Sequence, residues 1–234
     1  TAGDAPETME AIDLASTTTR ELNARLQGQA AGSNAAFEVQ HPGGRHALAC
    51  GLTAPIAVTL NGHVGYYCAG MNQNATVTVH GNAGVGVAEN MMSGLVRVKG
   101  DASQSAGATG HGGLLVIEGS ASARCGISMK GIDIVVKGSV GHNSAFMAQA
   151  GHLVICGDAE DGLGDSLYEA VIYVAGKTGT LGADCVEQEM SADDVAKVGE
   201  LLARAGIDAD PAGFRRYGSA RTLYNFKIDN VGAY

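Results

Sequence analysis

The stretch GNAGVGVAENMMSGLVRVKG, residues 81–100, decides the fold, because its pattern returns along most of the chain. It begins and ends on glycine, and the alternating Val96 and Val98 come just before the second glycine. The same spacing of 19 residues separates a series of glycines: Gly43, Gly62, Gly81, Gly100, Gly119, Gly138, Gly157 and Gly176. A fixed period of this length is the mark of a repeat architecture, in which stacked units share one core.

Two further columns of like residues appear when the repeats are aligned on the glycine. Aliphatic residues occupy the positions four and two before it, and this period-2 alternation is typical of a strand with one buried face. These pairs are Val58/Leu60, Val77/Val79, Val96/Val98, Leu115/Ile117, Ile134/Val136, Leu153/Ile155 and Ile172/Val174. Only small residues stand seven positions after it: Cys50, Ala69, Ala88, Gly107, Gly126, Ala145, Gly164 and Ala183.

Nineteen residues suit a coil of two or three short strands joined by glycine turns, and they are too few for a strand-helix unit of about 30 residues. Successive coils stack as parallel strands, so the seven intervals predict a rod of about 34 Å at a spacing of about 4.8 Å. We therefore expect an all-β fold: a single-stranded right-handed parallel β-helix with 19-residue turns over residues 37–186.

The flanks predict covers for the two ends of the rod. Residues 1–36 form an N-terminal extension with a short helix that begins at Thr18, with Glu21 completing a capping box, and ends at Gly28. Residues 187–234 hold an amphipathic helix over 191–206 and a tail that either caps the rod or docks on a partner; we expect docking, because aromatic and arginine side chains are enriched in interfaces. These tail residues are Phe214, Arg215, Arg216, Tyr217, Tyr224, Phe226 and Tyr234.

Composition narrows the classes of partner. The formal net charge is −9 and no basic block exists, which argues against nucleic acid and anionic membranes as partners. No apolar run reaches the roughly 18 residues that span a bilayer, and the start of the chain lacks the pattern of a signal peptide. The five cysteines are odd in number and form no CxxC. We expect a cytoplasmic protein with reduced thiols.

Few residues are arranged for chemistry. The glycine-rich stretches 81–86 and 162–164 lead into strands and not into the helix that a phosphate loop needs. The histidines show no metal-ligand spacing. They are His41, His46, His63, His80, His111, His142 and His152. The cysteines are expected to be small core residues: Cys50, Cys68, Cys125, Cys156 and Cys185.

Carboxylates and methionines each leave a choice open. Several acidic residues gather near the last turns, where a Ca²⁺ or sugar site is the alternative to a solvated or docking edge: Asp158, Glu160, Asp161, Asp165, Glu169 and Asp184. Four methionines fall at similar phases of their turns and indicate either core or a packing flank: Met91, Met92, Met129 and Met147. We expect no catalytic, cofactor-binding or metal-binding residue on this chain.

The repeat, with residues 81–100 as its clearest unit, resembles the GxGxG β-helix domain of glutamate synthase, which also recurs in one of the subunits of formylmethanofuran dehydrogenase. The segment LASTTTRELNARLQG at 14–28 resembles the lead into that domain. A chain that consists of this domain and ends in LYNFKIDNVGAY looks most like the β-helix subunits of N-methylglutamate synthases, the methylamine-glutamate N-methyltransferase complexes.

The resemblance implies a scaffold subunit in a hetero-oligomer. In such complexes a class II glutamine amidotransferase-like subunit hydrolyses glutamine, and a glutamate synthase-like subunit carries FMN and an iron-sulfur cluster. The alternatives are the β-helix subunit of an ordinary glutamate synthase, the β-helix subunit of a formylmethanofuran dehydrogenase, and a stand-alone β-helix carbohydrate-active enzyme.

Overall fold

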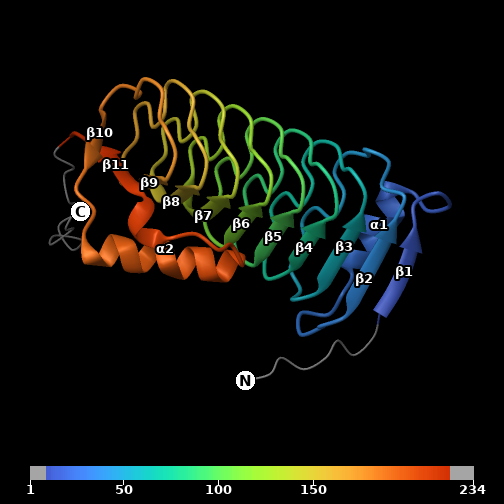
Figure 1. Cartoon of the computed structure of the whole chain (residues 1–234). Helices are drawn as coiled ribbons and strands as arrows, with labels where there is room; N and C mark the ends of the chain where they lie inside the picture. Colours follow the sequence, from blue (N-terminus) through green and yellow to red (C-terminus); the bar gives the residue numbers. More distant parts are fainter. Residues whose placement is uncertain (1–8, 222–234) are drawn as a thin grey trace, which may run out of the picture.

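The chain folds into a rod of stacked turns, which a computed structural model describes for residues 9–221 (Figure 1). One eleven-stranded sheet runs along it. The strands are β1 (Met9–Asp13), β2 (Ala36–Gln40), β3 (Ala57–Asn61), β4 (Thr76–Val79), β5 (Leu95–Val98), β6 (Leu114–Ile117), β7 (Lys130–Val136), β8 (Ala150–Ile155), β9 (Val171–Val174), β10 (Cys185–Gln188) and β11 (Arg215–Ser219). The helices are α1 (Thr19–Gln27), α2 (Ala192–Ala205) and the short 3-10 helix η1 (Pro211–Gly213).

The sheet confirms the predicted parallel β-helix. Strands β1 to β9 follow one another in chain order and pair in parallel, and from β3 onward each residue pairs with the residue 19 positions later, as Val77 does with Val96. One bulge interrupts this register between β7 and β8. Each turn holds one regular strand, and the second strand that we expected is reduced to a single bridge position, as between Ala83 and Ala102.

The first repeat departs from the predicted register. Ala36 pairs with Ala57 and Gln40 with Asn61, so the step from β2 to β3 is 21 residues. The residue that aligns with Gly62 is therefore His41, and the assignment of Gly43 to the glycine column is wrong. Gly43 lies in the two-residue insertion with a φ of 57°, a conformation that glycine adopts at low cost.

From Gly62 to Gly176 the predicted column is real, and close approach explains why it is glycine. A Cβ at Gly138 would lie 2.6 Å from the carbonyl oxygen of Gly119, and one at Gly119 would lie 2.6 Å from that of Gly100. The amide of Gly138 donates to the oxygen of Gly119 at 2.8 Å. Backbone thus packs directly on backbone from turn to turn, which leaves no room for a side chain.

Left-handed backbone explains the column of small residues. Ala69, Ala88 and Ala145 are fully buried with φ of 55–56°, and Gly107 and Gly126 adopt φ of 67° and 70° at the same position. Alanine is uncommon in this region. Hydrogen bonds between turns compensate the conformation, since the amide of Ala88 donates to the oxygen of Cys68 at 2.9 Å, and those of Ala69, Gly107, Gly126, Ala145 and Gly164 bond the preceding turn in the same way. The two end members of the predicted column are wrong: neither Cys50 nor Ala183 has a positive φ, and in the first turn Ala49 adopts it, at 55°.

Helix α1 closes the first turn of the rod. Its capping box between Thr18 and Glu21 and its end at Gly28 are confirmed. Leu22 and Leu26 enter the core. The side-chain amide of Asn23 donates to the oxygen of Ala47 at 2.7 Å and accepts from the amide of Ala49 at 2.9 Å. The helix therefore covers the core and also bonds backbone groups that the first turn exposes.

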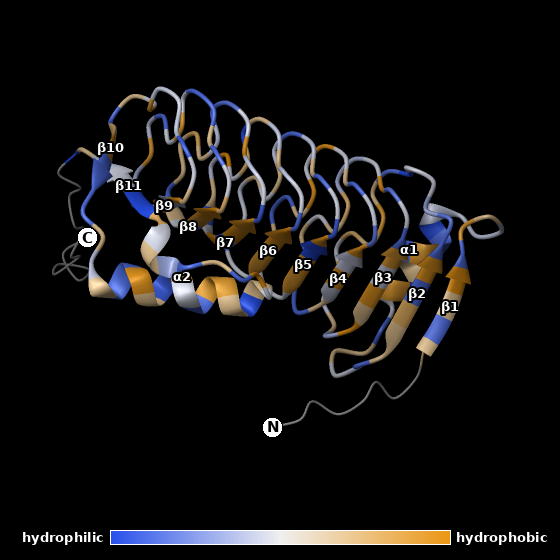
Figure 2. Cartoon of the chain, viewed as in Figure 1, coloured by the Kyte–Doolittle hydropathy of each residue, from blue (hydrophilic) through white to orange (hydrophobic). Residues whose placement is uncertain are grey.

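Helix α2 covers the outer face of the sheet over its C-terminal half (Figure 1). The central outward position of each strand is Thr59, Thr78 and Arg97 in β3 to β5, and becomes apolar from β6 onward: Val116, Val135, Val154 and Tyr173. Strands β6, β7 and β8 are correspondingly coloured as hydrophobic in Figure 2. These side chains form a second core with Val198, Leu201 and Leu202 of the helix. A helix of 14 residues is about 21 Å long, which matches four strands at about 4.8 Å each.

Polar contacts fix both ends of α2. At its C-terminus, Arg97 of β5 donates to the carbonyl oxygen of Ala205 at 2.8 Å, where a cation is favoured by the helix dipole. At its N-terminus, the buried carboxylate of Asp194 accepts from the Tyr173 hydroxyl at 2.6 Å, from the Ser191 amide at 2.9 Å and from Arg216. Burial favours the neutral form of Asp194, but these hydrogen bonds outweigh it and hold its pKa below the usual value.

We expect Asp194→Asn to lower the free energy of unfolding by about 1–3 kcal/mol at pH 7, because charge-assisted bonds to Tyr173 and Arg216 weaken. The folded-state pKa is depressed, so the carboxylate contributes its full stability above the unfolded pKa of about 3.9 and loses it as the pH falls below that value. Urea unfolding of both proteins between pH 7 and pH 3 checks this. The difference between them should shrink below about pH 4; a difference that is constant with pH would contradict the assignment.

The C-terminal end is closed by the chain itself. Strand β11 lies between β9 and β10 and is antiparallel to both. Phe214 is 3% exposed under α2, and Tyr217 is 1% exposed in the core of the rod. The predicted docking role is therefore wrong for these two residues, which cap their own chain. Tyr224, Phe226 and Tyr234 lie outside the described residues.

Candidate functional site

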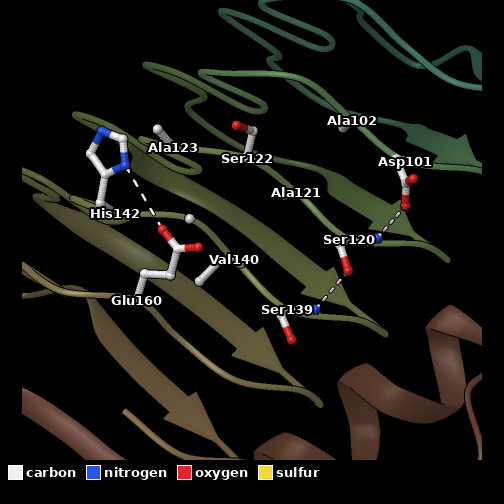
Figure 3. Close-up of a pocket in the computed structure, with 11 residues that line it drawn as sticks. Asp101, Ala102, Ser120, Ala121, Ser122, Ala123, Ser139, Val140, His142 and Glu160 are labelled. Carbon is white, nitrogen blue, oxygen red and sulfur yellow. Dashed lines mark hydrogen bonds and ion pairs between the residues drawn. The ribbon is translucent and has the colours of Figure 1, made fainter. Parts of the chain in front are cut away.

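A shallow groove of about 340 Å³ runs along the rod beside the glycine column (Figure 3). Its floor is made of small side chains that follow each glycine by two positions, among them Ala102, Ala121 and Val140, which are 2–6% exposed. Parallel bridges join Ala102 to Ala121 across successive turns. Because the floor residues stack in register, the groove follows the axis of the rod.

One wall of the groove is a row of polar side chains that directly follow the repeat glycines. The side chain of Asp101 accepts from the amide of Ser120 at 2.8 Å, and the hydroxyl of Ser120 accepts from the amide of Ser139 at 3.0 Å (Figure 3). The row, which we call the acceptor ladder, consists of His63, Asn82, Asp101, Ser120, Ser139 and Asp158 and ends on the amide of Lys177. These oxygen and nitrogen atoms bond the backbone of the next turn, so their primary role is structural.

Sequence reasoning missed the acceptor ladder, although its signal was present. A residue with a side-chain acceptor follows each glycine from Gly62 to Gly157, and Asn, Asp and Ser are the types that bond nearby backbone amides. Histidine fits the same role at His63, whose Nδ1 accepts from the amide of Asn82 at 2.9 Å.

The opposite wall carries the titratable pair of the groove. His142 Nδ1 lies 3.9 Å from Glu160 Oε2, beyond hydrogen-bond distance, and the two side chains are 57% and 68% exposed. Ser122 lines the groove without a hydrogen bond from its hydroxyl to His142 among the described contacts. Besides Asp101 and this separated pair, the lining consists of small apolar residues and serines, and no general base lies within hydrogen-bond distance of a nucleophile among them.

The acidic residues of the last turns are distributed over separate structural contacts. Asp158, Asp161 and Asp165 accept from the amides of the following turn, at Lys177, Thr180 and Ala183. The bond from the Thr180 amide lowers the pKa of Asp161. Asp184 pairs with Arg221. Within residues 9–221, no three His, Cys, Asp or Glu side chains converge as metal ligands do.

The histidines lie at separate places along the rod. His41 and His152 each contact an aspartate at 2.8 Å, Asp13 and Asp133 respectively. His46 stacks on Tyr66 with ring centroids 4.1 Å apart, and its Nδ1 accepts from the Tyr66 amide. His80 and His111 are exposed.

The cysteines are core residues, as the sequence predicted, except for the half-buried Cys156. Burial raises the pKa of Cys50 and Cys185 to about 11 and that of Cys125 to about 12, and it also raises the pKa values of Cys68 and Cys156. Since the thiolate is the nucleophilic form, the raised pKa values disfavour the reactive form of these thiols at neutral pH.

The methionines divide between the two interpretations. Met91 and Met129 are fully buried core residues, whereas Met92 and Met147 are 43% and 49% exposed.

The glycine-rich stretches behave as predicted: residues 81–86 lead into the corner and then β5, without a helix.

Comparison with known proteins identifies one full-length relative. Protein GlxC of Rhizobium meliloti (strain 1021) is 61% identical over 228 residues, which cover 97% of this chain and 100% of that protein. That name states no activity or ligand. No family model matches the chain. Across the described part of the chain, no helix has both the length and the apolar character that a membrane span requires.

Proposed function

This chain belongs to the family of protein GlxC, and on that premise we propose that it is the β-helix subunit of a multi-subunit, flavin-dependent, glutamate synthase-like enzyme. The observation that carries the proposal is the glycine column from Gly62 to Gly176, whose 19-residue repeat resembles the GxGxG domain of glutamate synthase. The GlxC protein is covered over its whole length, so the β-helix and its caps make up that relative without a fused catalytic domain.

Within this class we propose N-methylglutamate synthase, which converts glutamate and methylamine into N-methylglutamate and ammonia. The subunit would hold a class II glutamine amidotransferase-like subunit and an FMN and iron-sulfur subunit in a cytoplasmic hetero-oligomer. Direct backbone stacking at the glycine column supports a scaffold role, because closely packed turns have low compressibility. The catalytic chemistry would be supplied by the partner subunits.

Purification of the tagged chain from its native host tests the class. We expect a flavoprotein with an iron-sulfur cluster and an amidotransferase-like protein to copurify, and the complex to form N-methylglutamate from glutamate and methylamine. A complex that makes glutamate from glutamine and 2-oxoglutarate would replace this activity with ordinary glutamate synthase. Recovery of the chain alone, or turnover of a polysaccharide by it, would reject the scaffold role.

A further inference from the structure

The sheet has an open edge at the end of the rod opposite to the C-terminal cap, where β1 is the last strand (Figure 1). β2 pairs with one edge of β1, and no strand among residues 9–221 pairs with the other. Just after β1, the amide of Leu14 donates to the oxygen of Gln40 on the β2 side. Because alternate residues of a strand bond the same neighbour, the backbone groups of Ala11 and Asp13 point to the open edge.

The backbone groups on this edge can be named. The carbonyl oxygen of Asp13 accepts from the amides of Ser16 and Thr17 at 3.2 and 3.0 Å. Within residues 9–221, this leaves the amides of Ala11 and Asp13 and the carbonyl of Ala11 for a further strand. Such an edge is a template for pairing with another chain.

A groove of about 410 Å³ lies along this edge, between β1 and α1. Residues 10–13 of β1 all line it, although their side chains alternate between the two faces of the strand. Among the described residues, β2 contributes none to the lining. The groove therefore borders the backbone of the outer edge, and its other wall is formed by Glu21, Leu22 and Arg25 of α1.

The lining of the groove is acidic. It carries the three carboxylates of Glu10, Asp13 and Glu21 against the guanidinium of Arg25, which is already paired with Glu10 at 2.7 Å. Backbone hydrogen bonds lower the pKa of Asp13 and that of Glu21, so both are charged at neutral pH. The groove therefore favours a cationic occupant.

This charge excludes two occupants that the molecule itself could supply. In a second copy, β1 would bring the same Glu10 and Asp13 into the groove, where like charges repel. The segment TAGDAPET at residues 1–8 contains Asp4 and Glu7 and no lysine or arginine. A strand from a different protein is the occupant that can offset the carboxylates.

We propose that the outer edge of β1 docks an extended segment of another protein in which lysine or arginine alternates with apolar residues. The added strand bonds the open backbone groups of Ala11 and Asp13, as in other complexes that extend a sheet. Its cations lie on the face of Glu10, beside Glu21 of α1, and its apolar side chains lie on the face of Met9, which is 65% exposed. The proposal does not rest on the enzyme activity proposed above.

A synthetic peptide of alternating lysine and valine, six residues long and blocked at both ends, tests the proposal on the isolated full-length chain. We expect a Kd below about 1 mM. The amide resonances of Ala11 and Asp13 should shift, while those of β3 to β8 stay unchanged. A peptide of alternating glutamate and valine, of the same length, should bind at least about tenfold more weakly, because the groove repels it.

Three variants separate the strand edge from general attraction to an acidic protein. Ala11→Pro removes an amide that faces the added strand, and proline is tolerated in an edge strand where the amide faces solvent. It should weaken binding of the lysine peptide about tenfold without changing the charge. Asp13→Asn should weaken binding about two- to fivefold, as for one exposed ion pair. Asp208→Asn removes an exposed carboxylate outside the groove and should leave binding unchanged.

Four results would overturn the docking edge. No binding of the lysine peptide up to about 1 mM, or equal binding of both peptides, would show that the groove does not select a cationic strand. Unchanged binding to Ala11→Pro would assign the affinity to the overall charge of the chain. Slow hydrogen exchange at Ala11 without peptide would show that the edge is already occupied, by a second copy if protection grows with protein concentration and by the same chain if it does not.

Discussion

Gly138→Ala is expected to lower the free energy of unfolding by about 3 kcal/mol or more, which corresponds to a fall in Tm of roughly 6–12 °C for a chain of this size. The new Cβ would lie 2.6 Å from the carbonyl oxygen of Gly119 and close to the hydroxyl of Ser120. The atom that the Cβ would meet belongs to the backbone of Gly119 in the preceding turn, which cannot rotate away as a side chain could. Relief requires the two turns to separate, which breaks the 2.8 Å hydrogen bond between Gly138 and Gly119.

Gly32→Ala is the matched control, because a Cβ there has no atom within 4 Å and φ is not in the left-handed region. Its Tm should stay within about 2 °C of the parent, as for most surface changes. Thermal unfolding followed by circular dichroism compares the three proteins. Equal melting of Gly138→Ala and Gly32→Ala would mean that the turns do not pack backbone on backbone.

Val135→Asp is expected to cost more than about 4 kcal/mol and to release α2 from the sheet. Val135 is fully buried in the second core, between β7 and the helix residues Leu201 and Leu202. A carboxylate at this position either stays charged without a partner or takes up a proton at neutral pH, and both destabilise the packed state. Hydrogen exchange should show loss of protection throughout α2 before the rest of the rod opens.

Thr78→Asp places the same group at the equivalent position of β4, which α2 does not cover. Thr78 is half-buried and pairs in register with Arg97, whose cation offsets the added charge. We expect a loss below about 1 kcal/mol and unchanged exchange in α2. If both aspartates destabilised the chain equally, α2 would not be the partner of the apolar half of the sheet.

The repeat allowed the turns, the strands and the buried faces to be predicted, because like residues must stack on like residues in successive coils. The same counting misplaced Gly43, since a spacing of 19 residues can arise from a glycine in an insertion as well as from one in register. Only the hydrogen-bond pairing of the strands distinguishes a glycine in register from a glycine in an insertion. The 19-residue spacing in the sequence contains no information on that pairing.

The covering role of α2 was missed, although the sequence holds its signal. The central outward residue changes from Thr59 and Thr78 to Val116, Val135 and Val154, and an apolar residue on a solvent face indicates a cover. The inward-facing aliphatic pairs are alike in every turn, so they stand out as a repeat. The outward position differs from turn to turn, and its change from polar to apolar is found only by following that one position along the rod. The docking expectation for Phe214 and Tyr217 failed for a related reason. Enrichment of aromatic residues marks burial, but it does not say against which surface.

The acceptor ladder makes the length of this protein adjustable in whole turns. Each turn offers one side-chain acceptor to the turn that follows and receives one from the turn before, so a 19-residue unit can be duplicated or lost between Asn82 and Asp158 without leaving a backbone amide unpaired. Lys177 ends this series, because an ammonium group donates and cannot accept. A further copy added after it would lack this acceptor for its first amide, which would have to bond water at the exposed surface. Gene duplication can therefore extend the ladder from within the rod, whereas a copy added after Lys177 would interrupt it.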